Sequence, residues 1–401
     1  MGPQTLAAQL LESYEAGASF FFATPRRTLL ARGTFATVPH VGGADALARL
    51  PERVSAALDD ARQADHDIPV AVGAIPFDGS VPAQLVVPLT LQRAGPLAFE
   101  QDVQIQRPFT SSYTVQPVPE PAAYLDGVAR ALKLMQDGPL QKVVLSRSLQ
   151  LNAAAPINLR KLLHNLAWRN PSGYTFAADL PSRDGAPGEV RTLIGASPEL
   201  LVARSGFQVV ANPLAGSAAR SAEPLEDQER AAALLKSPKD LHEHAVVIEA
   251  VTEALRPYCK ALHVPADPSL VSTATMWHLS SRITGELADP SISSLTLAVA
   301  MHPTPAVCGY PTRLAHETIG AIEPFERGYY TGTVGWCDAT GDGQWAVTIR
   351  CAEASERTLR LFAGAGIVVG STPESELAET EAKFRTMLHA MGLGQSAGAT
   401  S

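Results

Sequence analysis

The sequence predicts a mixed α+β fold, and three observations favour it. Helical stretches alternate with strand-like runs, and residues 328–362 show a β-meander pattern with turns at residues 339–343 and 354–357. This order fits antiparallel strands better than a doubly wound parallel sheet. A length of 401 residues with 46% hydrophobic content is enough to bury a sizeable core, as one large two-layer enzyme domain or as two or three average domains.

Composition and charge narrow the class of protein. The formal net charge of −8 argues against a nucleic-acid surface, which needs a basic stripe, but leaves a small anionic substrate open. The N-terminus lacks a basic segment followed by an apolar core, and no apolar run reaches membrane-spanning length. The four cysteines are widely spaced, so reduced thiols are a better interpretation than a disulfide framework or a zinc site. We therefore expect a cytoplasmic protein that is not embedded in a membrane.

The first 115 residues are expected to form a scaffold subdomain without a catalytic site. A helix is predicted over residues 43–64, and strands are predicted over residues 19–23, 27–38, 70–75 and 85–91. The prolines of residues 116–121 predict a linker, because proline disfavours both a helix interior and a central strand. A catalytic domain over residues 116–391 follows, and residues 392–401 are expected to be a disordered tail.

Three features of the middle of the chain could carry chemistry. Lys142 lies on the more polar face of a strand predicted over residues 140–151, either as a charged guard of an edge strand or as a functional amine. Glu199 ends the turn of residues 195–199, either as a solvated glutamate or, in apolar surroundings that raise its pKa, as a general acid. A predicted turn at residues 213–217 could cradle an anion with its backbone N–H groups.

A further carboxylate lies on a helix that Ser237 and Pro238 begin. His242 and His244 point to nearly opposite sides of that helix, so the two cannot ligate one zinc ion. Glu243, between them, is a more plausible ligand of a hard cation.

The last third of the chain carries an arginine and a charged helix face. Arg350 lies on a strand predicted over residues 344–353, among small residues, where its fork could grip a planar anion or could pair with a nearby carboxylate. A glycine-rich turn is predicted at Gly364 and Gly366. On the helix predicted over residues 373–391, Glu376, Glu379 and Lys383 share one stripe, although Glu379 and Lys383 also fit a surface i,i+4 pair.

Two glutamates from different helices, without Cys or His partners, suit Mg²⁺, which prefers oxygen ligands and keeps several waters. Arg350 and Lys383 are suited to bind carboxylates. The residues by themselves therefore predict a Mg²⁺-dependent enzyme that acts on a small polycarboxylate.

Eight motifs carry a resemblance to a known family. In order along the chain they are residues 141–147 (QKVVLSR), 195–199 (GASPE), 213–217 (PLAGS), 239–244 (KDLHEH), 302–309 (HPTPAVCG), 347–350 (VTIR), 361–367 (LFAGAGI) and 379–383 (ETEAK). In these motifs the chain resembles the chorismate-utilising enzymes, which include isochorismate synthase, salicylate synthase and anthranilate synthase component I. The resemblance covers roughly residues 120–390, and it is strongest to the isochorismate synthases of catecholate siderophore pathways.

The resemblance implies a fold and a reaction. The fold is an α/β sandwich of two packed, mainly antiparallel sheets with outer helices and an active site in the cleft between subdomains. The reaction is the Mg²⁺-dependent conversion of chorismate to isochorismate, with Lys142 as the general base that activates water for attack at C2 and Glu199 as the general acid at C4.

The resemblance also implies the binding residues. Glu243 and Glu379 would hold Mg²⁺, with Glu376 behind them, while Arg350, Lys383 and the backbone at Gly364 would grip the enolpyruvyl carboxylate. Gly216 and Ser217 would line the ring carboxylate side, and His278 would be a supporting polar contact. Lys142 separates water-using members from the anthranilate synthases and argues against a glutamine amidotransferase partner. Like its relatives, the protein is expected to be a monomer.

Two residues bear on the choice between isochorismate synthase and salicylate synthase, which goes on to eliminate pyruvate. Ala306 matches the synthase-only pattern, whereas lyase-type members tend to have Thr there. Tyr330 departs from the Phe of enterobactin-type members and resembles the lyase-type residue. The sequence favours isochorismate as the released product, with salicylate synthase as the alternative and a non-catalytic chorismate-binding subunit as a more distant one.

Overall fold

Antiparallel strands form the centre of the molecule. In the computed structural model, which describes residues 3–43, 45–99, 112–182 and 190–393, the strands form sheets of ten, nine and three strands. The ten-stranded sheet runs in the order β18 (Gly309–Tyr310), β8 (Lys142–Ala153), β22 (Thr358–Val368), β21 (Cys351–Ser355), β10 (Arg191–Ser197), β9 (Tyr174–Leu180), β1 (Ser19–Ala23), β2 (Thr28–Arg32) and β6 (Thr90–Ala94), and β7 (Tyr113–Val118) pairs with β8.

The two other sheets are built in the same antiparallel way. The nine-stranded sheet runs in the order β14 (Cys259–His263), β17 (Ile283–Leu287), β12 (Gln208–Asn212), β11 (Leu200–Ser205), β20 (Gly343–Val347), β19 (Thr333–Asp338), β4 (Val70–Ile75), β5 (Gln84–Val87) and β3 (Ala36–Thr37). The three-stranded sheet consists of β13 (Leu214–Ala219), β16 (Met276–Ser280) and β15 (Ser269–Ser272).

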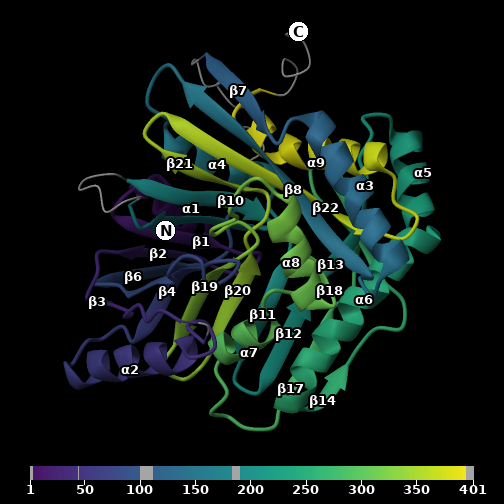
Figure 1. Ribbon diagram of the computed structural model, residues 1–401. Helices are drawn as coiled ribbons and strands as arrows, with labels where there is room; N and C mark the ends of the chain where they lie inside the picture. Colours follow the sequence, from purple (N-terminus) through teal and green to yellow (C-terminus); the bar gives the residue numbers. More distant parts are fainter. Residues whose placement is uncertain (1–2, 44, 100–111, 183–189, 394–401) are drawn as a thin grey trace.

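Helices cover the outer faces of the two large sheets. Their bounds are α1 (Pro3–Glu12), α2 (Leu50–Gln63), α3 (Pro121–Asp137), α4 (Leu159–Arg169), α5 (Pro224–Leu234), α6 (Pro238–Leu255), α7 (Ser294–Met301), α8 (Thr312–Ile322) and α9 (Pro373–Ala390), with a short 3-10 turn, η2 (Arg256–Tyr258), after α6. Helices α1, α4 and α9 pack on the ten-stranded sheet, and α2, α6 and α7 pack on the nine-stranded sheet. In Figure 1, α9 lies near the top and α2 and α7 near the bottom, with both sheets between them.

Strand β1 shows why the sheets stack. Its successive side chains point to opposite faces, so Phe20 and Phe22 enter the core between the two large sheets, while Phe21 packs under the outer helices. Val72 of β4 and Val334 of β19 meet Phe20 and Phe22 from the facing sheet. This confirms the predicted sandwich of two mainly antiparallel sheets with outer helices.

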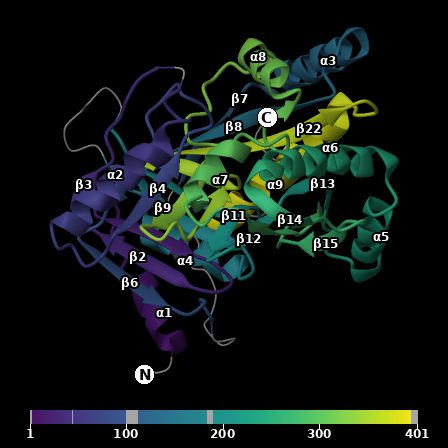
Figure 2. The ribbon, with the colours of Figure 1, turned by 90° about the horizontal axis from the view of Figure 1, so that it is seen from below.

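Helices α3 and α8 pack together at the end of β8, as Figure 2 shows. Tyr124 and Val128 of α3 meet Ala315 and Ile319 of α8 around Val143 of β8. This cluster fixes the strand that carries Lys142.

Several predicted boundaries are wrong. The strands predicted over residues 27–38 and 85–91 each divide into two, β2 and β3 in the first and β5 and β6 in the second. The predicted helix over residues 43–64 begins only at Leu50, because Pro51 has no N–H and fits the first turn of a helix. The first half of the predicted linker over residues 116–121 forms the end of β7, where Val118 pairs with Ser148 of β8, and Pro121 begins α3. Proline excludes a central strand but is tolerated at an edge, which is where β7 lies. The division of the chain at residue 115 falls inside β7 and stays a prediction.

The predicted meander is divided between two sheets. Its turns are correct, but the strand predicted over residues 344–353 breaks between β20, in the nine-stranded sheet, and β21, in the ten-stranded sheet. At the crossing point Arg350 has a φ of +52°, which is uncommon for a residue with a side chain. Arg350 therefore projects from the junction of the two sheets and not from the face of a strand.

The remaining global features concern the thiols, the membrane and the end of the chain. All four cysteines are free thiols, and Cys308, Cys337 and Cys351 are buried. Within the described ranges, no helix combines the length and the apolar character needed to cross a bilayer. Leu393 closes α9 by donating its N–H to the carbonyl of Leu388. The rest of the predicted tail, from residue 394 on, lies outside the described residues.

Candidate active site

The predicted functional residues gather around one cavity where the three sheets meet. It encloses about 610 Å³ of space not filled by protein atoms, part of it open to solvent. The predicted residues that line it are Glu199, Gly216, Ser217, Glu243, His278, Ala306, Tyr330, Arg350, Gly364, Glu379 and Lys383. Every described lining residue comes from residues 144–383, within the predicted catalytic region. Lys142 does not line the cavity and lies directly behind it.

Lys142 is fully buried at the start of β8. The strand is paired on both sides there, with Tyr310 of β18 and Val368 of β22 opposite the lysine. The alternative of a charged edge guard is therefore wrong. The Lys142 Nζ lies 2.9 Å from Oε1 of Glu243, which does line the cavity. The Glu243 carboxylate therefore lies between the Lys142 amine and the cavity.

Two glycines make room for these contacts. A Cβ at Gly366 would lie 2.2 Å from Oε1 of Glu243 and 3.1 Å from Cε of Lys142. A Cβ at Gly364 would lie 2.7 Å from Oγ of Ser146 and 2.9 Å from the hydroxyl of Tyr330. The predicted glycine-rich turn is wrong, because both residues lie inside β22. They mark the close approach of side chains to a strand.

Glu199 is a buried acid and not a solvated turn residue. Glu199 comes two residues after the end of β10, and its side chain lines the cavity and is 2% exposed. Burial raises the pKa of this carboxyl from 4.5 to about 7, and the Leu214 N–H at 3.4 Å from Oε1 and the charge of Lys142 offset burial only in part. The group is therefore present both as an acid and as a carboxylate near neutral pH.

Arg350 and His278 form a cationic corner. Nη2 of Arg350 donates to Nε2 of His278 at 3.2 Å, so the imidazole accepts there. Burial first, and then the charge of Arg350, lowers the pKa of His278 well below its usual value and keeps the ring neutral. Nη1 of Arg350 is buried without a hydrogen-bond partner in the described structure, and no carboxylate forms an ion pair with this side chain there. Arg350 is thus arranged to receive an anion that enters the cavity.

Lys383 and Glu379 line the opposite part of the cavity. Lys383 Nζ lies 2.5 Å from Oε1 of Glu379 and donates to the carbonyl of Gly364 at 2.7 Å. The two side chains are only 16% and 17% exposed, so the alternative of a surface pair is wrong. Burial opposes ionisation of Glu379, but Lys383 overcomes it and lowers the pKa of the carboxyl below its usual value. Glu379 therefore stays charged.

Two further carboxylates surround the predicted metal ligands. Burial and the charge of Glu379 raise the pKa of Glu376 to about 6, although Lys239 lies 2.7 Å from its Oε1. Burial raises the pKa of Asp240, and the nearby charges of Glu243 and Glu379 raise it further. Like charges thus crowd this side of the cavity.

The crowding bears on metal binding. Within residues 3–43, 45–99, 112–182 and 190–393, no three His, Cys, Asp or Glu side chains converge as a complete metal site. Two carboxylates with open space beside them fit Mg²⁺, because this ion takes one or two protein carboxylates and completes its shell with waters and substrate. The glycine at 366, which leaves room for Glu243, and the all-oxygen donor set agree with that ion.

The small sheet forms a third wall. The predicted turn over residues 213–217 is wrong, because Leu214–Ala219 is strand β13, whose pairing with β16 shifts register between Leu214 and Ser217. Gly216 has a φ of +78° at this irregularity, a conformation that favours glycine. Ser217 lies opposite His278 in the pairing. Strands β13 and β16 thus present Ser217 and His278 side by side to the cavity.

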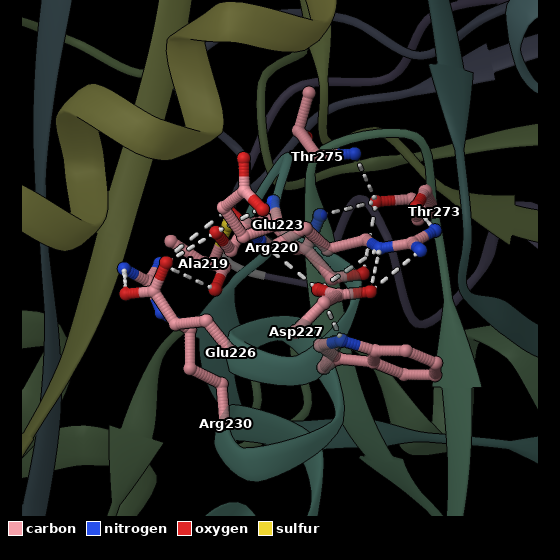
Figure 3. A network of polar contacts seen from close by, with 11 residues as sticks. Ala219, Arg220, Glu223, Glu226, Asp227, Arg230, Thr273 and Thr275 are labelled. Atoms are coloured by element: carbon pink, nitrogen blue, oxygen red, sulfur yellow. Dashed lines mark hydrogen bonds and ion pairs between the residues drawn. The ribbon is translucent and has the colours of Figure 1, made fainter.

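A polar network holds the small sheet to α5, as Figure 3 shows. The Asp227 carboxylate accepts from Arg220 Nη2 at 2.7 Å, from the Ser221 N–H at 3.0 Å and from Trp277 Nε1 at 2.9 Å. These hydrogen bonds, foremost that of Arg220, lower the pKa of Asp227 to about 2. Arg220 follows β13 and Trp277 lies on β16 beside His278. The network therefore ties both strands of the third wall to one helix.

We expect Asp227→Asn to lower the melting temperature and to raise KM for the substrate several-fold, because the amide cannot accept from all three partners. Thermal denaturation and steady-state kinetics measure the two effects. Glu229→Gln is the matched control, since Glu229 is exposed on the same helix and is not part of the network in Figure 3. Equal effects of the two substitutions would contradict a role for Asp227 in holding this wall.

The last wall combines Ala306 and Val307 with aromatic rings. Tyr330 stacks on Phe362 with centroids 4.8 Å apart, and its hydroxyl accepts from Ser146 Oγ at 3.4 Å. Phe362 is a lining residue that sequence analysis missed, because an isolated aromatic in a strand is usually part of a core. Thr331 was missed for a similar reason: its φ of +59° places it in the wall, and no sequence signal marks that conformation.

Comparisons with known proteins show the family of the chain. A family model described as "Chorismate binding enzyme" matches residues 89–392. The chain is 56% identical over 390 residues to isochorismate synthase DhbC of Bacillus subtilis (strain 168), covering 97% of each chain. It is 41% identical over 394 residues to the vibriobactin-specific isochorismate synthase of Vibrio cholerae, covering 98% of this chain and 96% of the relative. A crystal structure described as the 2,3-dihydroxybenzoate-specific isochorismate synthase DhbC of Bacillus anthracis matches with a TM-score of 0.90 and 51% identity, covering 97% of this chain and 100% of that one.

Proposed function

The chain belongs to the chorismate binding enzyme family, and we propose that it is an isochorismate synthase. The reaction adds water at C2 of chorismate, shifts the ring double bonds and releases the C4 hydroxyl as water. The observation that carries this proposal is a buried carboxyl with a pKa of about 7 in the same cavity as an arginine that has a free donor, with a buried amine behind it. Such a site can supply a proton at one ring position and remove one at another.

Glu199 supplies the proton. A general acid works best when its pKa lies near the pH of the reaction, and burial places Glu199 there. Protonated Glu199 donates to the C4 oxygen as the C–O bond breaks, so that water leaves in place of hydroxide. The carboxylate that remains is stabilised by the Leu214 N–H.

Lys142 removes the proton from the attacking water. The step requires an amine that is neutral at the moment when the water is deprotonated. Nζ of Lys142 is fully buried and has Glu243 as its ion-pair partner. The two groups come from different segments, Lys142 from β8 behind the cavity and Glu199 from the β10–β11 turn that lines it, which suits attack and departure at different ring carbons.

Chorismate carries two carboxylates, and the cavity offers a place for each. Arg350 and Lys383, together with the backbone at Gly364, bind the enolpyruvyl carboxylate, since Nη1 of Arg350 has no hydrogen-bond partner among the described residues. Gly216 and Ser217 lie on the side of the ring carboxylate, and His278 keeps the Arg350 fork in place.

Glu243 and Glu379 would hold Mg²⁺. When bound, the ion supplies positive charge that orients and partly neutralises the ring carboxylate.

We expect EDTA treatment to abolish turnover and added Mg²⁺ to restore it. Mg²⁺ should also raise the melting temperature of the wild type but not of Glu379→Gln, because binding to the folded state stabilises it. Full turnover after exhaustive chelation would contradict the metal role.

Isotope labelling tests the reaction itself. In H₂¹⁸O, isochorismate formed from unlabelled chorismate should carry one ¹⁸O atom, located at C2, because the new hydroxyl comes from solvent. Mass spectrometry of the product measures this. An unlabelled product would indicate internal transfer of the C4 hydroxyl and would overturn the water-addition scheme.

Salicylate synthase is the second candidate. Tyr330, whose hydroxyl reaches Ser146 at the cavity wall, is the residue that favours it. Ala306 and the identity to isochorismate synthases favour the first.

We also propose the pathway, the oligomeric state and the cellular location of the enzyme. The 2,3-dihydroxybenzoate specificity in the description of the Bacillus anthracis relative supports a role in supplying catecholate siderophore biosynthesis. A monomer in the cytoplasm, working without a glutamine amidotransferase subunit, agrees with a water-using site built from one chain. Gel filtration coupled to light scattering tests the monomer.

A further inference from the structure

A buried ion pair that lines no part of the cavity lies behind its Ala306–Tyr330 wall. Glu323 follows α8, and Arg327 precedes Tyr330. Arg327 Nη2 lies 2.5 Å from Oε1 of Glu323, and Nε lies 2.9 Å from Oε2, so the two planar groups face each other in a fork. Both side chains are only 2% exposed.

The polar atoms of the pair also contact the backbone of the cavity wall. Nη1 of Arg327 donates to the carbonyl of Val307, and Nη2 donates to the carbonyl of Val144, each at 2.7 Å. Glu323 Oε1 accepts from the Ser146 N–H at 2.8 Å. Val144 and Val307 both line the cavity, and Ser146 contacts Tyr330. One ion pair thus joins β8 to the loop that carries Ala306.

The guanidinium also supports the aromatic part of the wall. Its Cζ lies 5.9 Å from the ring centroid of Tyr330 and 4.7 Å from the ring centroid of Phe77. Its Nη1 reaches Oγ1 of Thr331 at 3.4 Å. Arg327 therefore contacts three segments of the wall: β8, the loop at residues 304–308 and the segment of residues 330 and 331.

We infer that the Glu323–Arg327 pair is a positioning unit that sets where Ala306, Val307 and Tyr330 stand against the substrate ring, and thereby sets both the rate and the product. The inference rests on the proposed function. These wall residues are the ones that bear on whether the ring product is released or goes on to lose pyruvate. Neither member of the pair touches the reacting atoms, so both act through the wall.

Stability alone does not explain this arrangement. A buried ion pair often contributes little net stability compared with apolar residues of the same volume, because both charges lose their hydration. Here the fork geometry is used in full, since three nitrogens of Arg327 make directed contacts that a lysine cannot reproduce.

The test is Arg327→Lys in the full-length enzyme. Lysine keeps the charge but loses the fork, so the carbonyls of Val307 and Val144 lose their shared donor. We expect kcat/KM for chorismate to fall about 10–100-fold, because small misplacements of reacting groups have effects of this size. The ratio of pyruvate to isochorismate should change as well, and amide exchange of residues 304–308 should become faster. A merely structural role would not move the product ratio.

Arg313→Lys is the matched control. Arg313 pairs with Glu317 at the same four-residue spacing, but the pair is exposed on α8 and contacts no wall residue. It should leave kinetics, product ratio and amide exchange unchanged. If Arg327→Lys does not fold, Glu323→Gln decides, because it keeps an acceptor for the Ser146 N–H and changes only one contact with Arg327.

The outcomes separate this inference from the proposed function. A wild type that forms no isochorismate would overturn the proposed function, and the exchange rates of residues 304–308 would still decide whether the pair holds the wall. An active wild type whose Arg327→Lys and Glu323→Gln variants keep its kcat, KM, product ratio and exchange rates would overturn the positioning role alone.

Discussion

Lys142→Ala is expected to lower kcat by about 10²–10⁴-fold, the usual contribution of a general base. The substitution removes the amine that lies behind the cavity with its Nζ 2.9 Å from Glu243, and no other described lysine pairs with Glu243. The loss should appear in kcat more than in KM, because Lys142 lies behind Glu243 and does not itself line the cavity where substrate binds. Steady-state kinetics with chorismate measure both constants.

Lys260→Ala provides the control for this substitution. Lys260 pairs with Glu286 at 2.8 Å on an exposed edge strand, so its removal should leave kcat unchanged. Circular dichroism of Lys142→Ala must show a folded protein, since the change also leaves Glu243 without its partner. A folded Lys142→Ala enzyme with wild-type kcat would exclude Lys142 as the base.

Glu199→Gln is expected to lower kcat by a similar factor of about 10²–10⁴, because the amide cannot donate an acidic proton to the C4 oxygen. In the wild type, kcat should decline as the pH rises through about 7, where burial places the pKa of Glu199. Glu199→Gln should lack that limb of the pH profile. Glu356→Gln, at an exposed turn, should retain it.

Although Glu199→Gln should lower kcat, it should raise the stability of the folded protein at alkaline pH. The folded-state pKa of Glu199 lies above its value in the unfolded chain, so the folded state binds the proton more tightly and stability falls as the pH rises from about 4.5 to about 7. This difference corresponds to roughly 3 kcal/mol. Urea denaturation at about pH 8 should therefore find Glu199→Gln more stable than the wild type. A Glu199→Gln variant that is less stable than the wild type at both acid and alkaline pH would contradict a carboxyl whose ionisation burial makes unfavourable.

Much of the candidate site could be predicted because its residues lie in recognisable local patterns. Lys142 stands out as a cation in an apolar strand, Glu379 and Lys383 share a helix face, and Glu199 follows a Ser-Pro turn. Phe20 and Phe22 enter one hydrophobic core and Phe21 enters another, because successive side chains of a strand point to opposite faces. An apolar residue at every position therefore indicates a strand that is buried on both faces, as in stacked sheets.

The parts that sequence analysis missed depend on contacts between distant segments. The hydrophobic pattern runs without interruption through residues 344–353, so nothing marks the crossing between sheets at Arg350. Gly366 has the pattern of a turn, yet it lies in a strand because Glu243, from a helix far away in sequence, approaches it. Glu323 and Arg327 resemble an ordinary surface pair, and only the folded chain shows that they are buried against Val144 and Val307.

Product analysis tests the central claim most directly. The purified protein is incubated with chorismate and Mg²⁺, and isochorismate and pyruvate are followed separately. We expect isochorismate to form without pyruvate, which would make Ala306 a better guide to the product than Tyr330. Salicylate with an equal amount of pyruvate would make the enzyme a salicylate synthase, and an unchanged chorismate pool would contradict the assignment of this cavity as the active site of an isochorismate synthase.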